Sequence, residues 1–249
     1  MIELRPADSI HAANGGWFQA RWHFSFADYR DPANMGFGDL RVFNDDRLIP
    51  GAVWPMHPHR DIEGITYVAE GTFEHADSLG NGGVLLPGSV QRATLGSGME
   101  HSERNHSQTE PLRFIQMWIM PAVRGLSPSV EQRSFTRDEL RGWLRPVLVP
   151  APGFGTHGTP SHADAVTVHQ DAVMYAGMLG PAGHDGVRLR HGYGGYVFAV
   201  HGSATLYCEG AEAGVIDEGG AAKIVGCERV ELRGGPDGAE VLLVETRVG

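Results

Sequence analysis

Glycine occupies 35 of the 249 positions of this chain, and a further 15 positions are proline. These residues recur at short intervals and separate segments rich in branched and aromatic side chains. The runs between them have the length of strands, as in GITYVAEG (64–71), GGVLLPG (82–88) and LRFIQMWIMP (112–121). Such close spacing of turn residues leaves little room for long helices. It predicts an all-β fold, either a sandwich or a barrel.

The two halves of the chain carry similar strand patterns. Further strand-like segments are 38–43, 71–77 and 91–96 in the first half, and 165–171, 173–179, 195–210, 221–226, 229–234 and 239–248 in the second. One helix is predicted at 134–143, with Ser134 or Thr136 as its cap. Residues 66–88 and 195–219 share an order of strand, glycine turn, strand, glycine-rich turn and strand. This weak repeat predicts two similar barrels, with the boundary between residues 122 and 150.

Charge, hydropathy and cysteine content exclude several classes of protein. The net charge of −10 argues against direct nucleic-acid binding, which needs a basic surface. No apolar run approaches the ~18–20 residues that cross a bilayer, and MIELRPADSI at the N-terminus lacks the layout of a signal peptide. Cys208 and Cys227 form no CxxC pair, which predicts two buried or half-buried thiols and a cytoplasmic location.

Two pairs of polar residues are the strongest functional signal. His57 and His59 stand two positions apart in PMHPHRDIEG (55–64), and His101 and Glu103 have the same spacing in GSGMEHSERNH (96–106). Residues i and i+2 of a strand point to the same face. On adjacent strands the two pairs would therefore bring together three imidazole nitrogens and one carboxylate oxygen. This set suits Fe, Mn, Ni, Co or Cu and leaves coordination positions open for water or substrate.

The spacing around these pairs resembles the two motifs of the cupins. The first motif is G-x5-H-x-H-x3,4-E-x6-G, and the second ends in G-x2-H-x3-N. The matching residues are Gly51, His57, His59 and Glu63 for the first motif and Gly98, His101 and Asn105 for the second. The last glycine of the first motif is one place late, at Gly71, and the proline of the second motif is missing. The core of both motifs is present.

More specifically, the chain resembles the pirin family, whose members are bicupins and include bacterial flavonol dioxygenases. The resemblance is close over residues 17–121, which contain HFSFADYRDP (23–32), GFGDLRVFNDD (36–46) and HPHRDIEGITYVAEG (57–71), and it is thinner over 166–179. It implies two tandem cupin barrels of the double-stranded β-helix, or jelly-roll, type. Residues 1–135 are then an N-terminal metal-binding barrel, and residues 136–249 a cupin-like barrel without a metal site.

The same resemblance implies a ligand set and an activity. The metal ligands would be His57, His59, His101 and Glu103, holding one divalent transition metal. Iron is the first choice, with Cu, Ni, Mn, Co and Zn as alternatives. The implied activity is a dioxygenase that opens the heterocycle of a flavonol such as quercetin and releases carbon monoxide. Its partners would be a phenolic substrate and dioxygen, with Glu103 as general base.

Two alternatives to this activity stay open. One is a metal- or redox-responsive regulator that acts by binding a protein partner. The other is an enzyme whose natural substrate is a different enolisable or phenolic compound, since one fold hosts many chemistries. A cavity over the metal, large enough for linked rings, would favour an enzyme over a regulator.

Several neighbouring residues have weaker assignments. Glu63, a ligand in many cupins, is expected to lie near the metal or at the edge of the core. Arg60 and Asp61 either orient the ligands or form a surface ion pair. His75 and His106 are not expected to be ligands, and His169, His184, His191 and His201 show no comparable spacing. Among the aromatic residues Phe24, Phe26, Phe37, Phe43, Phe114 and Trp118, most are expected to belong to the core and some to line a pocket, with Gln116 pointing into it.

Overall fold

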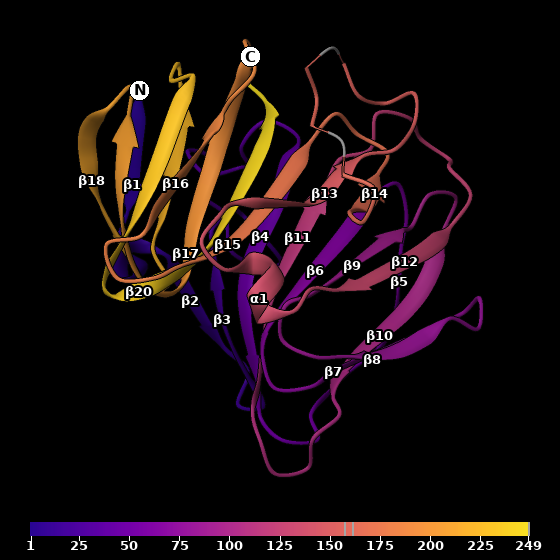
Figure 1. Ribbon diagram of the computed structural model, residues 1–249. Helices are drawn as coiled ribbons and strands as arrows, with labels where there is room; N and C mark the ends of the chain where they lie inside the picture. The colour runs from indigo at the N-terminus through magenta and orange to yellow at the C-terminus, as the bar shows by residue number, and fades with distance from the viewer. Residues whose placement is uncertain (157, 161, 249) are drawn as a thin grey trace.

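The computed structural model describes residues 1–156, 158–160 and 162–248, and strands make up most of it (Figure 1). The helical part consists of the 3₁₀ turn η1 (Ala7–Ser9) and the single turn α1 (Arg137–Leu140). Thr136 caps α1 as predicted, and it forms a capping box with Glu139. The helix is shorter than the predicted span 134–143. None of the described helices is long and apolar enough to cross a membrane.

The first half of the chain forms two sheets that enclose one barrel. The seven-stranded sheet has the order β12-β9-β6-β11-β4-β3-β2, and the four-stranded sheet has the order β5-β10-β7-β8. The strands of the larger sheet are β2 (His11–Asn14), β3 (Phe18–Trp22), β4 (Leu40–Leu48), β6 (Glu63–Glu70), β9 (Ser89–Thr94), β11 (Leu112–Ile119) and β12 (Ser129–Ser134). Those of the smaller sheet are β5 (Val53–His59), β7 (Phe73–Asp77), β8 (Gly82–Leu85) and β10 (Met99–Asn105). Apolar side chains of both sheets, such as Phe73 and Phe114, pack together between them.

The second half forms one nine-stranded sheet that folds over on itself. Its order is β1-β19-β17-β20-β15-β13-β14, with β16 paired to β20 and β18 to β17. The strands are β1 (Ile2–Arg5), β13 (Arg145–Pro150), β14 (Val166–Val168), β15 (Val173–Leu179), β16 (His184–Arg188), β17 (Tyr193–Cys208), β18 (Ala211–Asp217), β19 (Ala221–Val225) and β20 (Arg229–Arg247). The segments 229–234 and 239–248, expected as separate strands, both lie within β20 except for Val248, which follows its end. Val197 and Leu206, near opposite ends of β17, belong to the same apolar cluster, so the long strands supply both layers of this barrel.

The barrels share a continuous core where the larger sheet of the first packs on the sheet of the second (Figure 1). Phe43 and Met117 of the first half lie in one cluster with Phe198 and Val244 of the second. The N-terminal strand β1 pairs with β19 and so joins the sheet of the second half. The all-β fold with two barrels agrees with the sequence prediction. The division of the chain at residue 135 stays a prediction.

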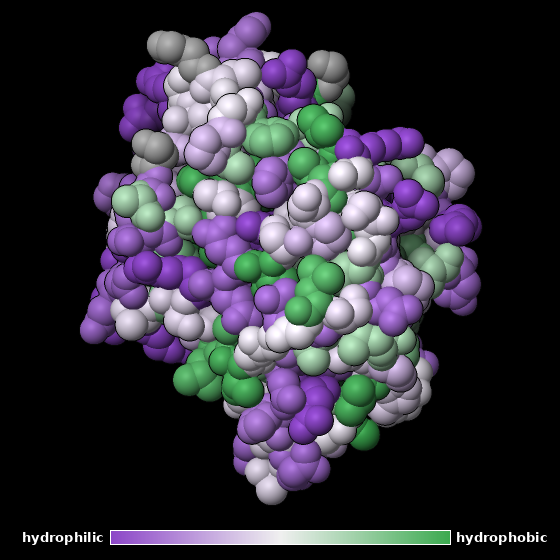
Figure 2. Space-filling model, turned by 90° about the vertical axis from the view of Figure 1, so that its right-hand side faces the viewer, coloured by the Kyte–Doolittle hydropathy of each residue, from purple (hydrophilic) through white to green (hydrophobic). Residues whose placement is uncertain are grey.

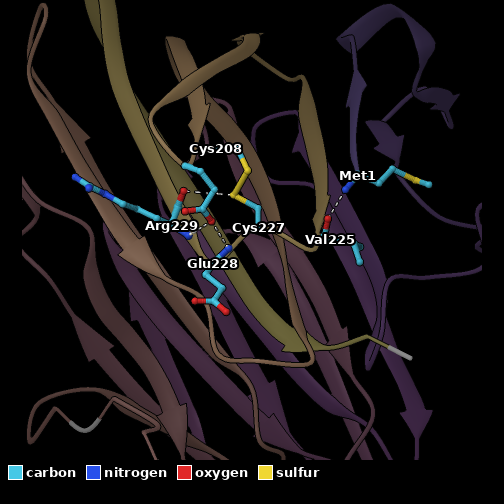
Figure 3. Close-up of a disulfide and its surroundings, with 7 residues drawn as sticks. Met1, Cys208, Val225, Cys227, Glu228 and Arg229 are labelled. Atoms are coloured by element: carbon cyan, nitrogen blue, oxygen red, sulfur yellow. Dashed lines mark hydrogen bonds between the residues drawn. A yellow bond between two sulfur atoms is a disulfide. The ribbon is translucent and has the colours of Figure 1, made fainter.

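The prediction of two free thiols is wrong, because Cys208 and Cys227 form a disulfide (Figure 3). Cys208 is the last residue of β17, and Cys227 follows the end of β19, which pairs with β17. Their Cα atoms lie 5.9 Å apart, within the range that a disulfide requires. The two cysteines are 19 residues apart in the chain. Their proximity is a consequence of strand pairing, which the spacing of the cysteines alone does not reveal.

Candidate metal centre

The strands β5 and β10 bring the two predicted ligand pairs together at the inner face of the smaller sheet. They pair antiparallel, with His101 opposite His57 and Met99 opposite His59. The register shifts between His101 and Glu103, so that Glu103 lies opposite Trp54. Such a bulge re-aims the side chains that follow it. The i, i+2 spacing places His57 and His59 on one face, and the pairing of His101 with His57 places His101 beside them, as the sequence predicted.

The three histidines form a compact group suited to one metal ion. A nitrogen from each of His57, His59 and His101 lies within 4.8 Å of the other two. The Nδ1 of His57 donates to the Pro55 carbonyl oxygen at 2.8 Å, which leaves its Nε2 free. Both ring nitrogens of His101 are buried without a hydrogen-bond partner among the described residues. Buried polar atoms almost always have a partner, so these unpaired nitrogens fit a metal ligand.

The protonation of two of these histidines also favours metal binding. Burial, with the neighbouring His57, lowers the pKa of His59 to about 4. Burial, followed by the charges of His57 and His59, lowers the pKa of His101 to about 3. Both rings are therefore neutral at pH 7 and offer a lone pair, which is the form that binds a metal.

Glu103 lies beside the three histidines but outside that compact group. Its Oε1 is 3.7 Å from Nδ1 of His101, and the side chain is 8% exposed. Burial raises the pKa of Glu103 to about 7. The carboxyl group can thus hold or release a proton near neutral pH, which is what a general base requires. The assignment of Glu103 as a fourth ligand stays a prediction.

A cavity of about 380 Å³ opens over the histidines. Of the residues expected to line a pocket, Phe26, Phe114, Trp118 and Gln116 do so, and Gln116 accepts a hydrogen bond from Thr66 at 2.7 Å. The ring of Trp118 packs edge-on against His59, with centroids 4.8 Å apart. The remaining predicted aromatic residues, Phe24, Phe37 and Phe43, lie in the core between the barrels.

The sequence reasoning missed seven other residues of this cavity, one of which is Ala27. Four are aromatic: Trp17, Phe18, Trp22 and Trp54. Two are polar, Asn44 and Asp46, and both point inward from β4. The alternation of LRVFNDDRL (40–48) could have indicated their common face, but NDD reads more readily as a turn.

Other residues singled out in the sequence are not part of the compact group of His57, His59 and His101. Arg60 is 75% exposed and 3.9 Å from Asp61, so the pair is a surface ion pair, the second of the two alternatives. His106 pairs with Glu74 at the surface. His75 is buried beside Asp77, with its ring centroid 5.8 Å from that of His101, and it is not part of the compact group.

Glu63 serves the contact between the barrels. It is fully buried, accepts a hydrogen bond from Thr94 at 3.1 Å, and lies 3.3 Å from Nδ1 of His169 in the second half. It is therefore an acid at the edge of the core, one of the two expected roles.

The inside of the second barrel is apolar. Leu206, Ile216, Val230 and Leu232 pack there, all of them buried. Cys208, Glu209 and Cys227 also lie close enough to hold a metal, but the disulfide occupies both sulfur atoms. The absence of a metal site from this barrel stays a prediction.

Comparison with known proteins identifies relatives over the whole chain. The family model described as Pirin matches residues 4–119, and the model described as Quercetinase C-terminal cupin domain matches residues 159–246. A putative quercetin 2,3-dioxygenase of Zymomonas mobilis is 36% identical over 99% of this chain and 98% of its own length. The quercetin 2,3-dioxygenase of Escherichia coli K12 is 45% identical over 70% of this chain and 71% of its own length.

The solved structures agree with these relatives. The structure of the Escherichia coli protein YhhW in complex with nickel(II), described as a bacterial pirin, superposes with a TM-score of 0.86. The two sequences are 34% identical, and the match covers 100% of each chain.

Proposed function

This chain belongs to the pirin family, and we propose that it is a metal-dependent dioxygenase that opens the heterocycle of a flavonol such as quercetin. The observation that carries the proposal is the placement of three metal-suited histidines at a cavity walled by aromatic rings. Relatives named quercetin 2,3-dioxygenase support an oxidoreductase of this type. The volume of about 380 Å³ falls within the range of small-molecule sites.

The residues of the cavity have separate roles in this proposal. His57, His59, His101 and Glu103 would hold a divalent metal, which supplies Lewis acidity and open coordination positions. Iron is the metal we propose, and the structure of the relative YhhW, described as a complex with nickel(II), supports a divalent transition metal.

The protein groups bind the substrate and handle its proton. Tryptophan and phenylalanine side chains, such as Trp54 and Trp118, offer faces and edges against which flat rings can stack. Glu103, which lies beside the histidines in the cavity, would take the proton of the flavonol hydroxyl and keep it within the cavity. The apolar walls exclude water, so the deprotonated substrate reacts with dioxygen and not with solvent.

Metal analysis combined with oxygen uptake tests the proposal. The native protein, a His101→Ala variant and a His106→Ala control are compared for bound metal and for dioxygen consumed with quercetin. The control removes an exposed histidine that pairs with Glu74 outside the cavity. We expect only His101→Ala to lose metal and oxygen uptake. Stoichiometric metal in His101→Ala would refute the assignment of His101 as a ligand. A metal-loaded native protein that consumes no oxygen with quercetin would refute the proposed dioxygenase activity.

The second candidate is a regulator that binds a protein beside the metal site. It is favoured by Val53 and Met56 on the ligand strand β5, which are 42% and 48% exposed. Figure 2 shows the side of the molecule on which β5 lies in Figure 1, where small apolar patches alternate with polar ones. Binding of a partner that depends on the metal, without oxygen uptake, would support this function.

A cytoplasmic location also remains a proposal. The cysteines do not support it, because Cys208 and Cys227 form a disulfide. The state of the two thiols in protein trapped directly from cells would test it.

A further inference from the structure

The cavity over the histidines contains two polar side chains that neither the metal nor the proton transfer accounts for. Asn44 and Asp46 lie on β4, where they are 2% and 4% exposed. They are two positions apart, so both point to the same face. Their neighbours on β11 are Gln116 and Phe114, which also line the cavity.

Each of these side chains has an unpaired buried oxygen. The Oδ1 atoms of Asn44 and Asp46 have no hydrogen-bond partner among the described residues. Leaving a buried acceptor unpaired costs about 1–3 kcal/mol. The cost is incurred twice, in a cavity whose other walls are mostly aromatic. A cavity that only had to hold an apolar ligand would be more stable with apolar residues at both positions.

Asp45, the residue between them on β4, differs in that it takes part in a structural ion pair. Asp45 points to the opposite face, where both its oxygens accept hydrogen bonds from Arg113 at 2.8 and 2.9 Å. Asp46 pairs with no cation of the described residues. Burial, followed by the charges of Asp45 and Glu103, raises the pKa of Asp46 well above its usual range. The unpaired Oδ1 of Asp46 can accept a hydrogen bond from a ligand in either protonation state of the carboxyl group.

We propose that Asn44 and Asp46 form a subsite that binds the hydroxyl groups of a polyhydroxylated aromatic substrate and thereby selects it over less hydroxylated analogues. Two acceptors side by side on one strand match a flat ligand with more than one hydroxyl donor. The aromatic walls bind the rings without distinguishing between such analogues. The inference rests on the proposed function only in placing the substrate in this cavity.

Equilibrium binding in the absence of dioxygen tests the subsite separately from catalysis. Quercetin, with five hydroxyl groups, is compared with 3-hydroxyflavone, which has the same ring system and one hydroxyl. Quenching of tryptophan emission reports binding, because several tryptophans line the cavity. The measurement is made on the protein as purified and again after metal removal.

The variants are Asn44→Leu and Asp46→Leu, which keep the branching of the side chain at Cγ and remove the acceptors. The control is Arg47→Ala, which changes a half-exposed residue on the opposite face of the same strand. The native protein and the control should bind quercetin more tightly than 3-hydroxyflavone. Each leucine variant should lose about tenfold or more of that preference, the value of one buried hydrogen bond to a polar or charged group.

The outcomes separate the subsite from the proposed function. A preference for quercetin that persists in both leucine variants would overturn the subsite. An equal loss of affinity for quercetin and for 3-hydroxyflavone would also overturn it. Loss of the preference without any cleavage of quercetin by the metal-loaded native protein would support the subsite and refute the dioxygenase. Each variant is judged by the ratio of its two affinities, so a general loss of stability cannot produce the expected result.

Discussion

Glu103 gives the sharpest test of the metal centre, because its carboxylate is buried without a compensating charge when no metal is bound. Burial raises its pKa from 4.5 to about 7. This difference corresponds to about 3 kcal/mol, at roughly 1.4 kcal/mol per pH unit. Replacement by glutamine keeps the shape and removes the charge. We therefore expect Glu103→Gln to stabilise the metal-free protein above pH 7 by up to about 3 kcal/mol.

The sign of the pH dependence follows from the direction of the shift. The folded protein holds the Glu103 proton more tightly than the unfolded chain does, so stability due to this group falls as the pH rises. The loss of stability due to Glu103 is absent below about pH 4.5, grows between pH 4.5 and 7, and is complete above about pH 7. The buried His59 and His101 act in the opposite direction below their usual pKa of 6.5. Comparing variant and native protein at each pH removes their contribution.

Urea denaturation of metal-free protein at pH 4.5 and pH 8 measures the effect. The control is Glu100→Gln, which changes an exposed residue on the same strand and should leave stability unchanged at both pH values. Adding a divalent metal should reverse the order of stability, because a bound ion stabilises the protein that binds it more tightly. Equal stabilities of the native protein and Glu103→Gln at pH 8 would refute the reasoning about burial. An unchanged order with metal would refute the ligand assignment.

Three further results are expected. Cys227→Ser should lower the free energy of unfolding by about 3 kcal/mol, since the disulfide closes a loop of 19 residues; an unchanged urea midpoint would contradict this. Arg113→Met should cost about 3–5 kcal/mol by leaving Asp45 buried and unpaired, and Arg113→Met/Asp45→Leu should recover part of the loss; equal stabilities of single and double variants would contradict it. Metal should be retained on dialysis just below pH 6.5, because the pKa values of His59 and His101 are lowered; metal analysis that shows release as soon as the pH falls below 6.5 would contradict it.

The sequence predicted those parts of the site that depend on local geometry. The histidines of β5 and β10 converge because i, i+2 spacing fixes the face of each side chain, and β15 spans the predicted residues 173–179. Local pattern could not predict the pairing of β1 with β19, which joins residues more than two hundred positions apart. The disulfide was missed for the same reason, since it depends on which strands become neighbours.

The polar residues of the cavity show a different limit of sequence reasoning. Asn44, Asp45 and Asp46 form a run whose composition favours a turn, yet they lie inside a nine-residue strand. Local preference is overridden here because β4 pairs with β11 on one side and with β3 on the other. Asp45 finds Arg113 on one face, whereas Asn44 and Asp46 face the cavity. Which face an acid occupies depends on strand register, and register depends on the neighbouring strands.

The two faces of β6 explain why the glutamate of the first motif is not placed to bind the metal. Residues of a strand alternate between its faces, so Glu63 shares a face with Tyr67, which is part of the core between the barrels. There Glu63 contacts His169, and the hydroxyl of Tyr67 donates to Glu240 of the second half at 2.6 Å. Thr66, on the other face, donates to the cavity residue Gln116. The polar residues that join the barrels are therefore separated from the metal centre by the thickness of one sheet. A glutamate that served as a metal ligand would have to lie on the cavity side, as Glu103 does, and it could not then contact the second barrel.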